Sequence, residues 1–243
     1  MKILAITFTF NEQDYLPYAV DYYRKQGVDL YVIDNFSTDG TFKWVKEQGI
    51  SGHQVDTQDA FHLQWLQDAL LTVVKEVKPD WFIWFSPDLF HVLSLIHTLR
   101  EVIEMADAQG FNQIKSPCYC FRNTGEDFQT PLPKYYRYAF QTASPVLLIS
   151  KYVEGNTTML ADVIIIPEPK IFEIGRIFEY GGCKPALIQE IKLARRQRAW
   201  ELGVPCSHGS HYLRGKELGW IYSKNELTDM WDDTNQQYLL NIQ

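Results

Sequence analysis

The sequence has little cysteine, no surplus of basic residues and no long apolar run, and each absence excludes a class of protein. Four cysteines in 243 residues, without a disulfide spacing, are too few for a disulfide-stapled secreted domain. A net charge of −7 provides no general electrostatic footprint for nucleic acid. No apolar run approaches the roughly 18 residues that span a bilayer. We therefore expect reduced thiols in a cytoplasmic protein, and contact with a membrane surface stays open.

The first hundred residues alternate between strand and helix patterns. Strands are predicted over residues 3–10, 28–33, 53–55 and 81–85, and helices over the stretch from Asn11 to Gly27 and over residues 41–48, 63–77 and 95–108. The first strand begins almost at Met1, and its apolar stretch is too short for a signal peptide. Apolar strands that alternate with helices are typical of a mainly parallel α/β sheet with helices on both faces.

The pattern is weaker beyond residue 108. Strands are predicted over residues 114–121, 145–149 and 163–166, a helix rich in Arg and Lys over 184–202, and a helical tail over 225–240. No repeat or linker divides the chain. We therefore expect a single domain over residues 1–243, with a ligand-binding half over 1–120 and a helix-rich, irregular half over 121–243.

Polar residues follow three of the predicted strands. Asn11 and Glu12 follow the first strand, Asp34 the second, and Ser86 and Asp88 the fourth. Ligands of parallel sheets bind beyond the carboxyl ends of the strands, so these side chains are expected at one edge. A carboxylate such as Asp34 suits the hydroxyls of a ribose, and one such as Asp88 suits Mg²⁺ or Mn²⁺. The sequence thus favours a nucleotide site.

Three segments together resemble family 2-type glycosyltransferases of the GT-A fold: residues 9–12 (TFNE), 32–41 (VIDNFSTDGT) and 80–91 (DWFIWFSPDLFH). Their order and spacing match together, which is more specific than any single motif. A basic stretch over 195–198 and the element His208-Gly209-Ser210-His211-Tyr212 fit the same resemblance loosely. The implied fold is a Rossmann-like GT-A sheet.

The resemblance implies transfer of a sugar from a nucleoside diphosphate sugar to an acceptor hydroxyl, with inversion and a divalent cation, in polysaccharide or glycolipid synthesis. The acceptor would be a saccharide or a lipid-linked molecule. Nucleotide-binding residues would be Thr9, Asn11, Glu12, Asp34, Asn35 and Ser86, and metal ligands Asp88, His208 and His211. Candidate catalytic bases are Glu126 and Asp127, with Asp162 as a further candidate.

One departure from the family pattern concerns the metal. Ser86 stands where the first carboxylate of the D-x-D motif is usual, and Leu89 stands where a further acid is usual. Asp88 remains, so we expect a weakened affinity for Mn²⁺ or Mg²⁺. The departure also keeps an alternative function open, that of a non-catalytic nucleotide-binding or assembly protein. A dehydrogenase or P-loop enzyme is disfavoured, because no matching glycine motif follows the first strand.

Several of these residues also have purely structural interpretations. Asn11 is equally well explained as the N-cap of the first helix. His208 and His211 are as well explained as loop residues, and the basic helix as a solvated face, against contact with a diphosphate or an anionic membrane. A zinc site from Cys118, Cys120, Cys206 and His208 is disfavoured by its unusual spacing.

Overall fold

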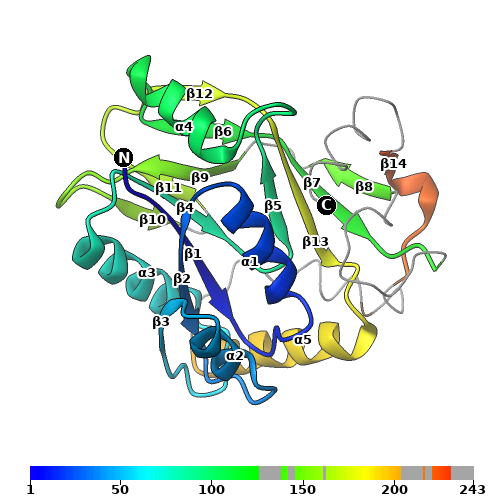
Figure 1. Cartoon of the computed structure of the whole chain (residues 1–243). Helices are drawn as coiled ribbons and strands as arrows, with labels where there is room; N and C mark the ends of the chain where they lie inside the picture. Colours follow the sequence, from blue (N-terminus) through cyan, green and yellow to red (C-terminus); the bar gives the residue numbers. More distant parts are fainter. Residues whose placement is uncertain (126–137, 142–145, 161–162, 204–215, 217–220, 231–243) are drawn as a thin grey trace.

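The computed structural model describes residues 1–125, 138–141, 146–160, 163–203, 216 and 221–230. A seven-stranded sheet forms the centre of the molecule, in the order β12-β6-β9-β4-β1-β2-β3 (Figure 1). Its strands are β1 (Ile3–Thr9), β2 (Asp29–Asp34), β3 (Ser51–Gln54), β4 (Trp81–Phe85), β6 (Gln113–Ser116), β9 (Val146–Lys151) and β12 (Ile171–Glu173). β1, β2, β3 and β4 pair in parallel, and β9 runs antiparallel to β4 and β6. The predicted mainly parallel sheet is confirmed.

Helices cover both faces of this sheet because residues of β1 alternate in direction. Leu4 and Ile6 share a core with Leu70 of α3 (Leu63–Val77), whereas Ile3 and Ala5 pack in the core that includes α1 (Leu16–Lys25) and α4 (Leu99–Ala108). The short helix α2 (Thr41–Glu47) packs on β2 and the first half of α1. The period-two pattern of one strand thus fixes a three-layer arrangement.

A second sheet lies beside the first, in the order β14-β8-β7-β13-β5 (Figure 1). Its strands are β5 (Leu89–Val92), β7 (Cys118–Arg122), β8 (Tyr138–Gln141), β13 (Arg176–Gly182) and β14 (Thr228–Asp229). A hairpin of β10 (Thr158–Leu160) and β11 (Val163–Ile165), helix α5 (Ala186–Glu201) and a 3-10 turn at Lys224–Glu226 complete the described elements. β13 pairs with both β5 and β7, so strand pairing crosses residue 120.

Four predicted element boundaries are wrong. α1 begins at Leu16 rather than after Asn11, and α4 begins at Leu99, where Thr98 and Glu101 form a capping box. The single strand predicted over 114–121 is divided between β6 and β7, with Pro117, which has no N–H to donate, between them. In the predicted tail helix, residues 228–229 form strand β14 instead, and residues 231–240 lie outside the described residues.

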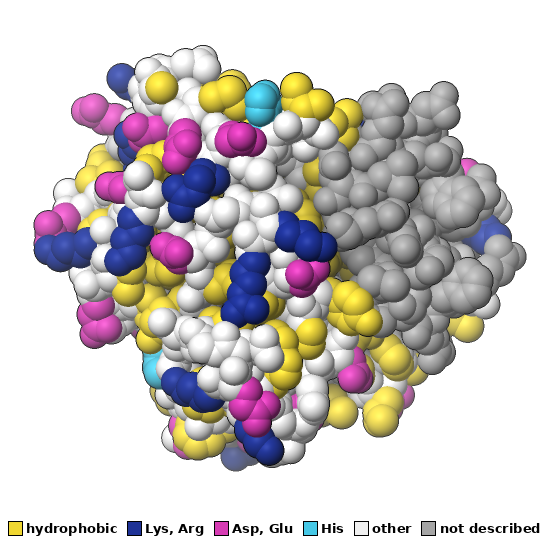
Figure 2. All heavy atoms as spheres, viewed as in Figure 1, with side chains coloured by type: hydrophobic (Ala, Val, Ile, Leu, Met, Phe, Trp, Pro, Cys, Tyr) yellow, Lys and Arg dark blue, Asp and Glu magenta, His cyan; other side chains and the backbone are white. Residues whose placement is uncertain are grey.

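Within the described part of the chain, no helix is both long enough and apolar enough to cross a membrane. Acidic and basic side chains are interspersed over the described part of the face shown in Figure 2.

Candidate active site

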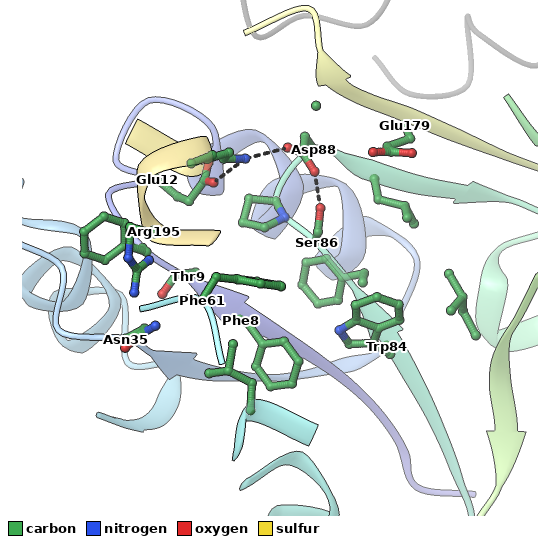
Figure 3. Close-up of a pocket in the computed structure, with 18 of the residues that line it drawn as sticks. Phe8, Thr9, Glu12, Asn35, Phe61, Trp84, Ser86, Asp88, Glu179 and Arg195 are labelled. Carbon is green, nitrogen blue, oxygen red and sulfur yellow. Dashed lines mark hydrogen bonds and ion pairs between the residues drawn. The ribbon is translucent and has the colours of Figure 1, made fainter. Parts of the chain in front are cut away.

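A cavity of about 480 Å³ opens beyond the carboxyl ends of β1 and β4, where the sequence predicts the ligand site. Its polar lining includes Thr9, Glu12, Asn35, Ser86, Asp88 and Glu179, and its apolar lining includes Phe8, Phe61, Leu66, Trp84, Leu148 and Val163. Figure 3 shows Asn35 and Arg195 at one end of the cavity and Glu12, Asp88 and Ser86 at another. The site therefore has two polar regions joined by an apolar wall.

Four charged side chains form an ion cluster at the Glu12 end: Glu12, Asp88, Lys184 and Lys192. The Lys184 ammonium lies 2.8 and 2.6 Å from the two carboxylate oxygens of Glu12 and 2.7 Å from Oδ2 of Asp88. Lys192 lies 3.4 Å from Glu12 and 3.5 Å from Asp88. Both carboxylates are buried, and the side chain of Lys184 is 0 % exposed. Two cations thus balance two anions inside the protein.

Asp88 is anionic in this environment. Burial alone would raise its pKa, but Lys184 and Lys192 hold the pKa of Asp88 well below its usual range. The Ser86 hydroxyl also donates a hydrogen bond to the Asp88 carboxylate, so the residue at the first D-x-D position is a partner of Asp88. A Cβ at Gly181 would lie 3.2 Å from Asp88 Oδ2 and from Glu179 Oε1, so glycine leaves open the space between these carboxylates.

Asp34 does not line the cavity. It is fully buried and accepts hydrogen bonds from four neutral donors: the Thr9 hydroxyl at 2.9 Å, the Ser37 N–H at 2.9 Å, the Ser37 hydroxyl at 2.5 Å and the Gln54 side-chain amide at 3.0 Å. These bonds tie the ends of β1, β2 and β3 together. The prediction that Asp34 contacts a nucleotide is not tested by these bonds and stays a prediction.

Asn11 and Asn35 join the loops around the cavity. Asn11 Oδ1 accepts from the Thr38 N–H at 2.8 Å, and the helix N-cap interpretation of Asn11 is wrong because Tyr15 occupies that position. Asn35 lines the cavity, and the amide orientation that satisfies its neighbours places Oδ1 2.5 Å from Arg195 Nη2. Asn35 therefore links the end of β2 to α5.

Helix α5 turns two of its basic side chains inward. The Arg195 guanidinium lies 3.5 Å from the centroid of the Phe10 ring, and that of Arg196 lies 4.3 Å from the centroid of Phe61. Burial lowers the pKa of Arg195 to about 10, so it is protonated at neutral pH. Both arginines line the cavity. The interpretation of this helix as a solvated face is therefore wrong for these two residues.

Glu179 of β13 lines the cavity beside a pair of thiols. Cys120, its partner in the register of β7, donates from Sγ to Glu179 Oε2 at 2.9 Å, and the Sγ atoms of Cys118 and Cys120 are 3.9 Å apart. The hydrogen bond with Cys118, and after it burial, raise the pKa of the Cys120 thiol. Ligand atoms of these three residues lie within 4.8 Å of one another. Burial alone would lower the pKa of Arg122, but Glu179 and Cys120 raise it.

Sequence reasoning did not identify Lys184, Lys192 or Glu179 as site residues. The basic composition of the α5 region was the available signal for the lysines, whereas β13 brings Glu179 to the cavity only through tertiary pairing. Five predicted residues lie outside the described residues: Glu126, Asp127, Asp162, His208 and His211. Their proposed roles as bases or metal ligands stay predictions.

The implied divalent cation does not fit the arrangement at Asp88. Mg²⁺ and Mn²⁺ require oxygen ligands in direct contact. Both carboxylate oxygens of Glu12 and Oδ2 of Asp88 lie within 2.8 Å of the Lys184 ammonium, and the Ser86 hydroxyl donates to Oδ1 of Asp88. Metal binding by Asp88 stays a prediction.

The fold and the cavity together define an α/β protein with a cavity at the carboxyl ends of its parallel strands, which is where ligands of this architecture bind. The sequence profile of glycosyl transferase family 2 matches residues 5–160, and the chain belongs to this family. The matched range covers β1 from residue 5 onward and all of β2 and β4, whose ends bring Thr9, Asn35 and Ser86 to the cavity. The predicted family resemblance is confirmed.

Comparison with solved structures finds S. aureus TarS and a Mycobacterium tuberculosis glucosyl-3-phosphoglycerate synthase. TarS superposes with a TM-score of 0.48 at 15% identity over 97% of this chain and 45% of its own. TarS 1–349 in complex with UDP superposes with a TM-score of 0.42 at 18% identity, over 53% of this chain and 39% of its own. The synthase in complex with Mn²⁺, UDP-glucose and phosphoglyceric acid superposes with a TM-score of 0.35 at 20% identity, over 48% of this chain and 44% of its own. The chain thus spans less than half of these proteins. No curated protein matches.

Proposed function

We propose that this protein transfers a sugar from a nucleoside diphosphate sugar to a hydroxyl of a saccharide or lipid-linked acceptor, with inversion, in polysaccharide or glycolipid synthesis. The observation that carries the proposal is the coincidence of the family match with the cavity: the strands matched by the family profile end in its polar lining. We treat the chain as one unit in this function, because strand pairing joins its two halves.

The cationic residues of α5 supply the electrostatic requirement of such a reaction. Departure of a nucleoside diphosphate leaves negative charge on its phosphate oxygens, and fixed cations in a water-poor cavity stabilise that charge. Lys192, Arg195 and Arg196 all line the cavity. We assign the nucleoside to the end formed by Thr9, Asn35 and Arg195, and the diphosphate to the region between Arg196 and Lys192.

Transfer also requires a base that removes the acceptor proton. Among the described cavity residues, Glu179 is a carboxylate outside the ion cluster. Its Oε2 accepts a hydrogen bond from a thiol, which leaves Oε1 for an acceptor hydroxyl. We propose Glu179 as the base, with Glu126 and Asp127 as the competing candidates.

Nucleotide binding tests the assignment of the cavity. UDP, GDP, ADP and their sugar conjugates are titrated calorimetrically, with UDP first because a TarS structure contains it. Arg195→Ala should weaken binding of the preferred nucleotide by about tenfold or more, which corresponds to about 1.4 kcal/mol for one lost charged contact. Arg198→Ala is the matched control, since Arg198 is exposed on the same helix. Absence of binding by any nucleotide would reject the proposal.

Turnover separates the transferase from the non-catalytic alternative. Release of the nucleoside diphosphate from the bound sugar nucleotide is measured with the wild-type protein and with Glu179→Gln. Loss of a general base should lower the rate by about 10²- to 10⁴-fold with nucleotide affinity retained. An unchanged rate in Glu179→Gln would move the base to Glu126 or Asp127. Tight nucleotide binding without turnover in the wild type would support the binding or assembly protein instead.

A further inference from the structure

Lys184 is buried against groups that a cation prefers. Its ammonium has three donors, and three carboxylate oxygens lie within 2.8 Å of it, two from Glu12 and one from Asp88. The Tyr15 ring centroid lies 4.4 Å away, in the range of a cation–π contact. The side chain is 0 % exposed, so no solvent replaces any of these partners.

The carboxylates that hold Lys184 stand at the position where a divalent cation is expected. Asp88 is the remaining acid of the metal-binding motif, and Glu12 follows the first strand. A divalent cation would need the same oxygens at about 2.0 to 2.6 Å. A divalent cation could bind these oxygens only if the Lys184 ammonium were displaced from them, and the buried ammonium would then lose its partners. The ammonium and a divalent cation are therefore alternatives at this position.

Lys192 is the lysine of the ion cluster that lines the cavity. It lies on the first half of α5, lines the cavity and has a side chain that is 21% exposed, in contrast to the enclosed Lys184. Arg196 lies one helical turn further along and bonds to the Lys192 carbonyl at 3.2 Å. Lys184 and Lys192 together balance the two carboxylates, so Arg196 adds positive charge beside the cluster, at the space assigned to the diphosphate.

We propose that Lys184 takes the place of the divalent cation, so that this protein binds its nucleoside diphosphate without a metal, through Lys192, Arg195 and Arg196. This inference rests on the proposed function. It also explains why a serine stands at position 86 in place of the usual acid. The Lys184 ammonium needs fewer oxygen ligands than a divalent metal ion, so the site needs fewer carboxylates. Ser86 then supports Asp88 by donating to it rather than by binding metal.

The first test needs no variant. The dissociation constant of the preferred nucleotide is measured in EDTA and in Mn²⁺ with the wild-type protein. We expect the two values to agree within about twofold, whereas a metal-bridged diphosphate would bind at least about tenfold more weakly in EDTA. Binding that appears only with Mn²⁺ overturns the inference and leaves the proposed function intact. Absence of binding in both buffers rejects the proposed function itself.

A variant tests the exchange directly. Lys184→Ala removes the internal cation and leaves Glu12 and Asp88 free to bind a metal, so Mn²⁺ should raise the melting temperature of this variant and not that of the wild type. Lys115→Ala, which removes a partly exposed partner of Glu173, is the control and should gain no response to Mn²⁺. A folded Lys184→Ala without a response to Mn²⁺ contradicts the exchange. Where the variant does not fold, the wild-type comparison decides.

Discussion

Asp34 and Asp88 stand at the same edge of the central sheet and are both buried, yet their surroundings differ. Asp34 accepts hydrogen bonds from hydroxyl, backbone and amide groups, none of which is charged. Asp88 lies against two ammonium groups. Asp34 therefore fixes the loops that follow β1 and β2, whereas Asp88 belongs to a charge-balanced cluster at the cavity.

The difference shows that the position of a carboxylate after a strand does not determine its role. Asp34 has no bond to a charged group among the described residues, and it does not line the cavity. Asp88 lines the cavity and is compensated by Lys192 of α5 and by Lys184, which lies two residues before that helix. The hydrogen-bond and ion-pair partners differ, so Asp34 contributes to the fold, whereas Asp88 contributes to the electrostatics of the site.

The largest expected effect comes from removing the charge that balances Asp88. Lys184→Met leaves two buried carboxylates with only Lys192 as a cation, and breaking a buried ion pair costs about 3 to 5 kcal/mol. Urea denaturation measures the change in the free energy of unfolding. Lys78→Met, which removes an exposed pair with Glu154, is the matched control and should leave the midpoint unchanged. Equal effects of the two substitutions would remove the distinction between Asp88 and a surface acid.

A smaller effect is expected at Asp34. Asp34→Asn keeps the shape but turns an amide N–H₂ toward donors such as the Ser37 N–H and the Gln54 amide, which should cost about 1 to 3 kcal/mol. The same urea experiment measures it. Asp29→Asn, at the exposed start of β2, serves as the control. A loss as large as that of Lys184→Met would mean that Asp34 carries a charge-dependent role that its neutral partners do not explain.

The smallest effect is a dependence on pH. The folded state holds the pKa of Asp88 below its usual value, so as the pH falls below about 4 the unfolded chain takes up this proton first and unfolding becomes more favourable. One proton contributes at most about 1.4 kcal/mol per pH unit. Stability between pH 4 and pH 2.5 should therefore fall more steeply in the wild type than in Asp88→Asn. Parallel curves would show that Asp88 is not held ionised by its neighbours.

Much of the fold was predictable because its strands and helices are strongly patterned. The limits predicted for α3 and β4 are those of the structure. Of the strand-end residues expected at one edge, Glu12, Ser86 and Asp88 line the cavity, whereas Asn11 and Asp34 do not. Such features depend on hydrophobic periodicity and on the geometry of parallel sheets, both of which are local or general.

The rest depended on contacts between distant residues. Lys184 meets Glu12 across 172 positions of sequence, and no local pattern indicates that a lysine before a basic helix will be fully buried. Asn11 is a residue type typical of a helix N-cap, but its side-chain Oδ1 accepts a hydrogen bond from the Thr38 N–H, and α1 begins only at Leu16. Arg195 and Arg196 face inward because Phe10 and Phe61 offer them aromatic faces.

Binding of Mn²⁺ to the wild-type protein without nucleotide tests the central claim most directly. The electron paramagnetic resonance signal of free Mn²⁺ is followed as the protein is added. Because Lys184 occupies the oxygens of Glu12 and Asp88, we predict no loss of signal that depends on Asp88, so wild type and Asp88→Ala should give the same titration. Stoichiometric binding of Mn²⁺ by the wild type that disappears in Asp88→Ala would contradict the account.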